Sequence, residues 1–232
     1  MHNTLVFFAW ILIDLVFLLT AFTLWGERGV LVVIAASVVM MNLFVLKGMR
    51  LFGLDATGGN VLYASIFLGT DILTEYYGPQ TARRGVMIGF FCSVLFLAAT
   101  RFILLFQPAE WDLFHPHMQE LFTPVWRVTG ASMAAYLASQ HLDVFTYHRL
   151  KLRLPRQLWL RNNGSTLTSQ AVDSLLFCTA AFTGVYPVRV VAGIVLSTYL
   201  LKAAVALLDT PFLYLTRVIV RLRGIPEKGG TT

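Results

Sequence analysis

The sequence contains little charge. Asp, Glu, Lys and Arg together make up 13% of its 232 residues, against roughly 25% in an ordinary soluble domain. Hydrophobic residues reach 57%. So few charged side chains argue against a water-soluble domain of this length, and the composition predicts an integral membrane protein.

Motifs for several chemistries are also absent. The sequence has no Walker-type glycine-rich loop, so it does not predict ATP hydrolysis by that route. Its two cysteines, Cys92 and Cys178, lie in apolar stretches, where we expect them to pack as small hydrophobic residues. His115 and His117 have no cysteine or further ligand nearby and are a weak metal signal. No nucleophile with a base and an orienting group is visible, so we expect neither an enzyme nor a bound cofactor.

Seven apolar stretches are long enough to cross a bilayer as helices. They are residues 5–24, 30–46, 61–76, 86–106, 125–145, 165–185 and 188–208. Because the third and sixth are the most polar, the sequence predicts an all-α polytopic membrane helix bundle of seven or six transmembrane helices. We expect residues 1–232 to form one domain, in which residues 1–24 add an N-terminal helix and residues 224–232 form a flexible tail. Pro211 would kink the last helix if it runs on past residue 208.

Loop charge predicts the orientation of this bundle. Lys and Arg recur through residues 148–161 and again after residue 220, whereas residues 107–124 contain none. Because basic loops remain in the cytoplasm, we expect the C-terminus inside and, with seven helices, the N-terminus outside; Lys47 and Arg50 would be exceptions. The net charge of +6 is thereby explained by orientation, and a nucleic-acid partner has little support.

Polar side chains inside the third stretch give the first functional signal. Asp71 and Glu75 lie four residues apart and share one face of a helix. A carboxylate in hydrocarbon costs at least ~2.5 kcal/mol, so two together need a partner or a use. The pair predicts a polar site within the membrane. Asp14 and Asp209 lie toward the ends of their stretches, and we expect them to reach headgroup water.

The sixth and seventh stretches carry matching polar positions. Thr166, Gln170 and Asp173 project along one face of the sixth, and Tyr199 and Lys202 follow in the seventh. Because a lone ammonium at this depth needs a counter-ion, we expect Lys202 to pair with an acid of the third or the sixth stretch, Asp71 or Asp173. A purely structural network of buried ion pairs is the alternative.

Several of these segments resemble a known family. Residues 67–78, FLGTDILTEYYG, followed by Ala82, Arg83 and Arg84, are similar to the signature of the queuosine-precursor transporter family, also known as the vitamin-uptake-transporter-like family. The polar positions of the sixth and seventh stretches look like the family's paired C-terminal helices, and Arg127 also fits. The resemblance covers roughly residues 38–215. Some members start at the helix equivalent to residues 30–46, so the role of residues 1–24 stays open.

The resemblance implies uptake of 7-cyano- or 7-aminomethyl-7-deazaguanine across a prokaryotic inner membrane, for salvage into modified tRNA. A guanine-like edge offers two adjacent donors that one carboxylate accepts together, and its O6 requires a donor. Aromatic side chains stack on such rings. We therefore expect a substrate site formed by Asn42, Phe67, Asp71, Glu75, Arg127, Thr166, Gln170, Asp173, Tyr199 and Lys202.

Three function classes fit the sequence. The first is a self-sufficient secondary-type importer, and the second is a substrate-binding membrane subunit of a multi-component, ATP-driven vitamin or nucleobase uptake system. The third is an intramembrane enzyme. The resemblance favours the first class and leaves the energy source, the oligomeric state and the preference between the two substrates open.

Overall fold

Long helices account for most of the chain. The computed structural model describes residues 2–123, 125–184 and 187–224, apart from the side chains of residues 54, 55 and 125–128. The α-helices of these residues are α1 (His2–Trp25), α2 (Glu27–Phe44), α3 (Tyr63–Tyr76), α4 (Pro79–Ile103), α5 (His115–Phe122), α6 (Val125–Arg153), α7 (Leu158–Phe182) and α8 (Val188–Arg223). Within the described chain, α1, α2, α4 and α8 are each long and apolar enough to cross a membrane. The predicted helical membrane architecture is confirmed.

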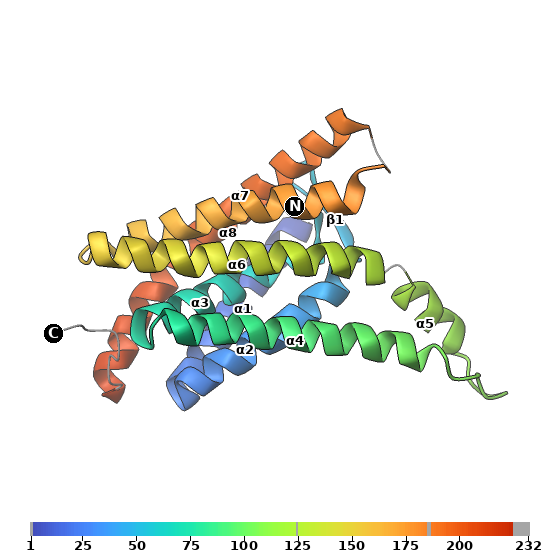
Figure 1. Cartoon of the computed structure of the whole chain (residues 1–232), viewed down its shortest axis with the longest axis horizontal. Helices are drawn as coiled ribbons and strands as arrows, with labels where there is room; N and C mark the ends of the chain where they lie inside the picture. The colour runs from blue at the N-terminus through green and yellow to red at the C-terminus, as the bar shows by residue number, and fades with distance from the viewer. Residues whose placement is uncertain (1, 124, 185–186, 225–232) are drawn as a thin grey trace.

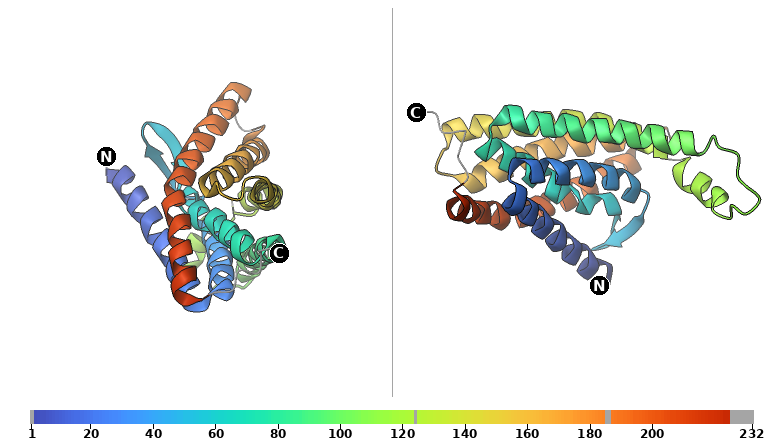
Figure 2. Two further views of the ribbon diagram at one scale, coloured as in Figure 1. Left: turned by 90° about the vertical axis from the view of Figure 1, so that its left-hand side faces the viewer. Right: turned by 90° about the horizontal axis from the view of Figure 1, so that it is seen from below.

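The long helices lie side by side in one elongated bundle (Figure 1). Helix α6 packs against α7, α7 against α8, and α2 against both α3 and α4. The turn between α6 and α7 lies at the same end of the bundle as the end of α8, whereas α5 and the β-hairpin lie toward the other end (Figures 1 and 2). The two ends of the bundle are therefore formed by different elements.

Helix α3 occupies the centre of the bundle. It packs against α1, α2, α4, α6 and α8, and all of its residues except Glu75 are buried. Close approach to α2 needs a small residue, because a Cβ on Gly69 would come within 3.0 Å of Ile34 Cγ1. Large apolar side chains such as Phe17 and Phe91 are instead exposed on the outer surface, as expected for a surface covered by lipid. Helix α3 is thus enclosed by protein, which allows it to carry polar residues.

A β-hairpin, which the sequence analysis did not predict, connects α2 to α3. Strands β1 (Gly48–Leu51) and β2 (Leu54–Thr57) pair antiparallel. Phe52 and Gly53 form the turn with φ values of 54° and 80°, the positive values that suit a two-residue hairpin. The 3₁₀ turn η1 (Gly58–Val61) then leads into α3. The hairpin forms part of one end of the bundle, where it lies close to α8.

Two aspartates lie deeper than expected. Asp14 is 7% exposed and Asp209 is 1% exposed, so the expectation that both reach headgroup water is wrong. Asp14 Oδ2 accepts a hydrogen bond from the backbone N–H of Ser65 at 3.2 Å, and Asp209 Oδ1 accepts one from Asn162 Nδ2 at 2.8 Å. Each carboxylate accepts a hydrogen bond from a neighbouring helix. The position of an aspartate within its own helix does not predict such a partner.

Several helix boundaries extend beyond the apolar stretches. Helix α6 continues to Arg153, α7 begins at Leu158, and α8 continues through Pro211 to Arg223. Helix α8 changes direction along its length (Figure 2), as expected for a helix with an internal proline. The predicted tail begins at Gly224, and its residues 225–232 lie outside the described part of the chain.

Candidate functional site

A buried ion pair joins α7 to α8. Lys202 Nζ donates a hydrogen bond to Asp173 Oδ2, and both side chains are enclosed. Ser139 of α6 donates to the other carboxyl oxygen of Asp173 at 3.1 Å. The Lys202 ammonium also lies 3.6 Å from the ring centre of Tyr63, in the first turn of α3. Four helices therefore meet at this ion pair, and the counter-ion of Lys202 is Asp173.

Two aromatic rings lie on α3 beside the ion pair. Tyr63 and Phe67 stack with ring centres 6.0 Å apart and planes at 27°, and both side chains are buried. Phe67 was among the expected site residues, whereas Tyr63 was not. Tyr63 lies one helical turn before Phe67, so the i, i+4 spacing could have placed it on the same face.

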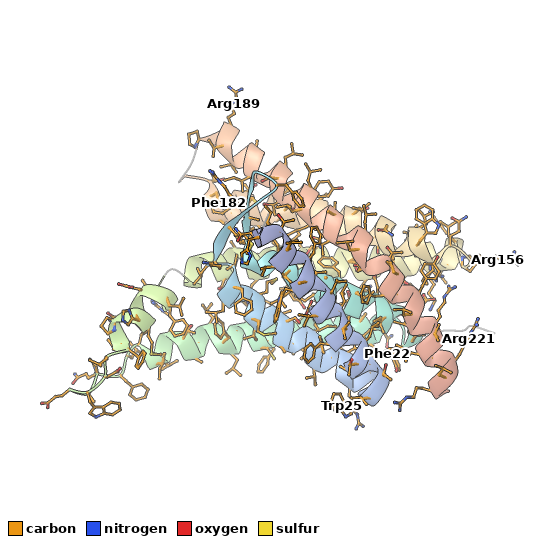
Figure 3. All side chains as sticks on the ribbon, turned by 180° about the vertical axis from the view of Figure 1, so that it is seen from behind. Phe22, Trp25, Arg156, Phe182, Arg189 and Arg221 are labelled. Carbon is orange, nitrogen blue, oxygen red and sulfur yellow. The ribbon has the colours of Figure 1, made fainter. Side chains whose placement is uncertain are left out.

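A pocket of about 660 Å³ opens toward one end of the bundle, and its described lining does not include the ion pair. It lies between the hairpin, η1 and the adjoining ends of α7 and α8, at the end of the molecule where Figure 3 labels Phe182 and Arg189. Phe177 and Thr198 line it, each four residues from a member of the pair and so one helical turn away. The pocket therefore leads toward Asp173 and Lys202.

Two carboxyl groups meet at another point in the bundle. Asp71 of α3 and Asp143 of α6 lie within hydrogen-bonding reach of each other and are 1% and 0% exposed. Ser169 donates to Asp143 Oδ1 at 3.0 Å. Asp143 Oδ2 and both oxygens of Asp71 accept no hydrogen bond from the described residues, and no Lys or Arg of the described chain forms an ion pair with either acid.

Asp143 was not among the expected site residues. The predicted fifth stretch, residues 125–145, places it two residues before the end of a membrane span. Because α6 continues to Arg153, Asp143 lies almost three helical turns before the end of the helix. The basic residues that follow it could have shown that the helix extends farther, since basic side chains reach from helix ends to the interface.

Polar side chains of α7 connect the two acidic sites. Thr166 and Gln170 are both buried and lie one turn apart on the helix that also carries Asp173. Thr166 lies beside the Asp143 carboxyl group, but its hydroxyl makes no well-directed hydrogen bond within the described structure, and neither does Gln170 Oε1. The structure thus places Phe67, Asp71, Thr166, Gln170, Asp173 and Lys202 in the interior of the bundle.

Glu75 forms a separate cluster near the turn between α6 and α7. Its Oε1 accepts a hydrogen bond from Arg161 Nη2 at 2.8 Å, and its Oε2 accepts one from the Tyr147 hydroxyl at 3.2 Å. Lys151 Nζ lies 3.8 Å from Oε2 and also donates to the backbone carbonyl oxygen of Glu75. The cluster holds α3, α6 and α7 together at this end of the bundle.

The remaining expected site residues lie elsewhere. Asn42 Nδ2 donates to Ser93 Oγ at 3.0 Å, which joins α2 to α4. Tyr199 lines an apolar groove between α7 and α8, together with Leu175 and Leu196. The side chain of Arg127 lies outside the described part of the structure.

Comparison with known proteins gives consistent matches. A family model described as "Putative vitamin uptake transporter" matches residues 57–216. The "Probable queuosine precursor transporter" of Bacillus subtilis (strain 168) is 40% identical over 217 residues, which cover 93% of this chain and 94% of that protein. The "Queuosine precursor transporter" of Escherichia coli (strain K12) is 32% identical over 161 residues, which cover 68% and 67%. No solved structure shows significant similarity to the chain.

Proposed function

Because this chain belongs to the vitamin uptake transporter family, we propose that it imports queuosine precursors of the 7-deazaguanine class across a bacterial inner membrane. The family is one of transporters rather than enzymes. The Bacillus subtilis relative, which matches almost the whole chain, is named for queuosine precursors. In this proposal the protein is a secondary-type importer that works alone and supplies its substrate for salvage into modified tRNA.

The proposed topology has seven membrane-spanning helices, α1–α4 and α6–α8, with α5 at the outer surface. Arg156 and Arg221 lie at one end of the molecule and Arg189 at the other (Figure 3). The basic residues 149–161 and 217–223 fall at the first of these ends. Because basic segments remain in the cytoplasm, this end faces the cytoplasm and carries the C-terminus. The pocket beside the hairpin then faces outward.

The observation that carries the proposal is the Lys202–Asp173 ion pair, which lies one helical turn along α7 and α8 from residues that line this pocket. The Asp173 carboxylate can accept both donors of a guanine-like edge, and the Lys202 ammonium can donate to O6. In this structure Lys202 donates a hydrogen bond to Asp173. Substrate can therefore replace one buried interaction by another without leaving either charge unpaired.

Aromatic side chains complete the proposed substrate site. Tyr63 and Phe67 lie beside the ion pair, and bases stack readily on aromatic rings. Gln170, whose buried Oε1 has no donor within the described structure, offers a further acceptor one turn from Asp173. The pocket volume of about 660 Å³ lies within the ~300–1,000 Å³ typical of small-molecule sites. We propose that substrate enters through this pocket and binds between α3, α7 and α8.

The Glu75 cluster supplies the proposed inner gate. Arg161 is almost fully buried, and its ion pair with Glu75 ties α3 to α7 at the cytoplasmic end. A pocket at the proposed outer end and an ion-pair cluster at the proposed inner end would fit an outward-open state in this proposal. Alternating access then requires α3 and α7 to separate at Glu75 while the outer pocket closes.

Uptake by the purified protein alone tests the proposal. The protein is reconstituted in liposomes and given labelled 7-cyano-7-deazaguanine, with Asp173→Asn and Lys202→Ala as site variants and Asp112→Asn as a matched control in the loop before α5. We expect uptake by the wild type and the control and none by the site variants, provided that these fold. Binding without uptake would instead support a subunit of an ATP-driven system, and absence of both would refute the proposed substrate.

A further inference from the structure

We propose that Asp71 and Asp143 form a proton-binding site that couples uptake to the proton gradient. The inference rests on the proposed function, because it concerns the energy source of that transport. The two side chains come from α3 and α6, and their carboxyl groups lie within hydrogen-bonding reach of each other in the interior of the bundle. This arrangement places two groups of like charge in contact, away from water.

Among the described residues, no Lys or Arg forms an ion pair with either carboxylate. Lys202 is paired with Asp173, and Arg161 is paired with Glu75. Mutual repulsion and burial both disfavour the doubly ionised pair, so one proton shared between the two oxygens is the stable form. The titratable or charged groups facing the pair are Glu75 of α3, Tyr147 of α6, Arg161 of α7 through Glu75, and Asp209 of α8.

Most carboxyl oxygens of the pair also lack hydrogen-bond donors among the described residues. Three of the four carboxyl oxygens of the pair, both of Asp71 and Oδ2 of Asp143, accept no hydrogen bond from the described residues. The buried hydroxyl of Thr166 lies beside Asp143 but makes no well-directed hydrogen bond within the described structure. Buried acceptors are normally satisfied. A proton held between Asp71 and Asp143 supplies a donor to one of these oxygens.

The position of the pair suits coupling. On α3, Asp71 lies one turn from Phe67 of the proposed substrate site and one turn from Glu75 of the proposed inner gate. Opening of that gate moves α3 away from α6 and α7, which separates the two carboxyl groups and exposes them to water. Both then ionise, and the shared proton passes to the cytoplasmic water. Each cycle takes up one proton outside and releases one inside, so that one carboxyl O–H bond forms and later breaks.

The test separates coupling from transport itself. The substrate is 7-cyano-7-deazaguanine, which lacks the amine of the aminomethyl form, so that its distribution does not respond to a charge on that group. In proteoliposomes, tracer exchange at equal pH reports transport alone, and accumulation with the outside acidic reports coupling. We expect the wild type to exchange and to accumulate substrate up to about tenfold per pH unit if one proton is coupled.

Two variants assign the coupling to this pair. In Asp71→Asn and in Asp143→Asn, the new amide can donate to the remaining carboxylate as the shared proton does, so the bundle keeps its packing. We expect Asp143→Asn to exchange substrate but to show no accumulation above an inside-to-outside ratio of one, and Asp71→Asn to lose accumulation as well. Asp112→Asn, in the loop before α5, should behave as the wild type in both assays.

The possible failures are distinguishable. A wild type that shows no exchange refutes the proposed function, not the coupling. A wild type that exchanges but ignores the pH gradient, or accumulates only with a sodium gradient, overturns the proton site. So does an Asp71→Asn variant that accumulates substrate normally. If the variants fail to fold, wild-type protein is treated with dicyclohexylcarbodiimide, which modifies protonated carboxyl groups in apolar surroundings. Labelling of Asp71 or Asp143, located by mass spectrometry, supports the site, and labelling of neither overturns it.

Discussion

Asp14 on α1 accepts a hydrogen bond from the backbone amide of Ser65 on α3, with 3.2 Å between Oδ2 and N. Ser65 lies in the first turn of α3, where backbone N–H groups have no partner within their own helix. The carboxylate of one helix therefore caps the start of another. The helix dipole favours a negative charge at this position, so α3 can begin inside the bundle immediately after η1.

Replacement of Asp14 should destabilise the protein rather than inactivate its site. Asp14→Ala removes the acceptor for a buried amide, and we expect a loss of about 0.5–2 kcal/mol, as for other helix caps. Asp14→Asn keeps a side-chain oxygen but loses the charge, and should cost less. Thermal unfolding of the purified protein in detergent measures both. Equal melting temperatures for the wild type and Asp14→Ala would show that the hydrogen bond contributes nothing.

Labelling from outside tests the proposed topology. In a protein whose own two cysteines have been replaced, Asp112→Cys should react with an impermeant thiol reagent applied to intact cells, and Arg153→Cys should not. The reason is the concentration of basic residues at the end of the bundle that contains Arg153. Reaction at Arg153→Cys together with protection at Asp112→Cys would invert the bundle. Permeabilised cells, in which both positions should react, provide the control.

Sequence patterns predicted the helical bundle and much of its polar interior, for identifiable reasons. A charged residue within an apolar run has to face protein, and Asp71, Asp173 and Lys202 are indeed buried. The same principle was set aside for Asp14 and Asp209, which lie toward the ends of their apolar stretches, yet both are buried. Asp143 was not predicted as a site residue, because α6 continues past the predicted end at residue 145 to Arg153. For α1, the carboxylate of Asp14 meets an amide of another helix.

The helical periodicity of the sequence also does not predict which neighbouring helix packs against a given face of a helix. Tyr199 and Lys202 lie three residues apart on α8 and project about 60° from each other around the helix axis. This angle is sufficient to direct Lys202 to Asp173 and Tyr199 into the apolar groove beside Leu175. Tyr63 of α3 instead supplies the ring next to the ammonium. Which of two tyrosines contacts a lysine depends on helix packing, which a single sequence does not encode in its spacing.

The two tyrosines provide a matched comparison. If bases stack near the ion pair as proposed, Tyr63→Ala should weaken substrate binding by about 1–3 kcal/mol, the range for loss of one aromatic–base stack. Tyr199→Ala should leave affinity unchanged, because its ring lines a groove outside the proposed site. Isothermal titration with 7-cyano-7-deazaguanine measures both affinities. A larger loss for Tyr199→Ala than for Tyr63→Ala would move the site to the apolar groove.

Weakening the Glu75 cluster should open the cytoplasmic end. Glu75→Gln removes the charge that pairs with Arg161, and a hydrogen bond to a charged group contributes about 1.5–3 kcal/mol. With Thr166→Cys as a reporter in a cysteine-free protein, a water-soluble thiol reagent should react faster in inside-out vesicles when Glu75→Gln is present. Glu110→Gln, in the loop before α5, is the matched control. An unchanged reaction rate would show that the cluster does not close the inner end.

Variants of the Lys202–Asp173 pair test whether it stabilises the fold, binds substrate, or does both. Removal of one partner leaves the other buried and unpaired, so Lys202→Met alone should destabilise the bundle by about 3–5 kcal/mol. Asp173→Asn should be milder, because the amide oxygen can still accept a hydrogen bond from Lys202. The double variant Lys202→Met with Asp173→Asn leaves no unpaired charge and should recover most of the stability of the wild type, since replacing a buried pair by neutral groups is often close to neutral. If the pair binds substrate as proposed, this double variant folds but does not take up 7-cyano-7-deazaguanine.

Thermal unfolding and liposome uptake, measured on the same preparations, distinguish the structural role from the functional one. Normal uptake by the folded double variant would show that the pair only stabilises the contact between α7 and α8.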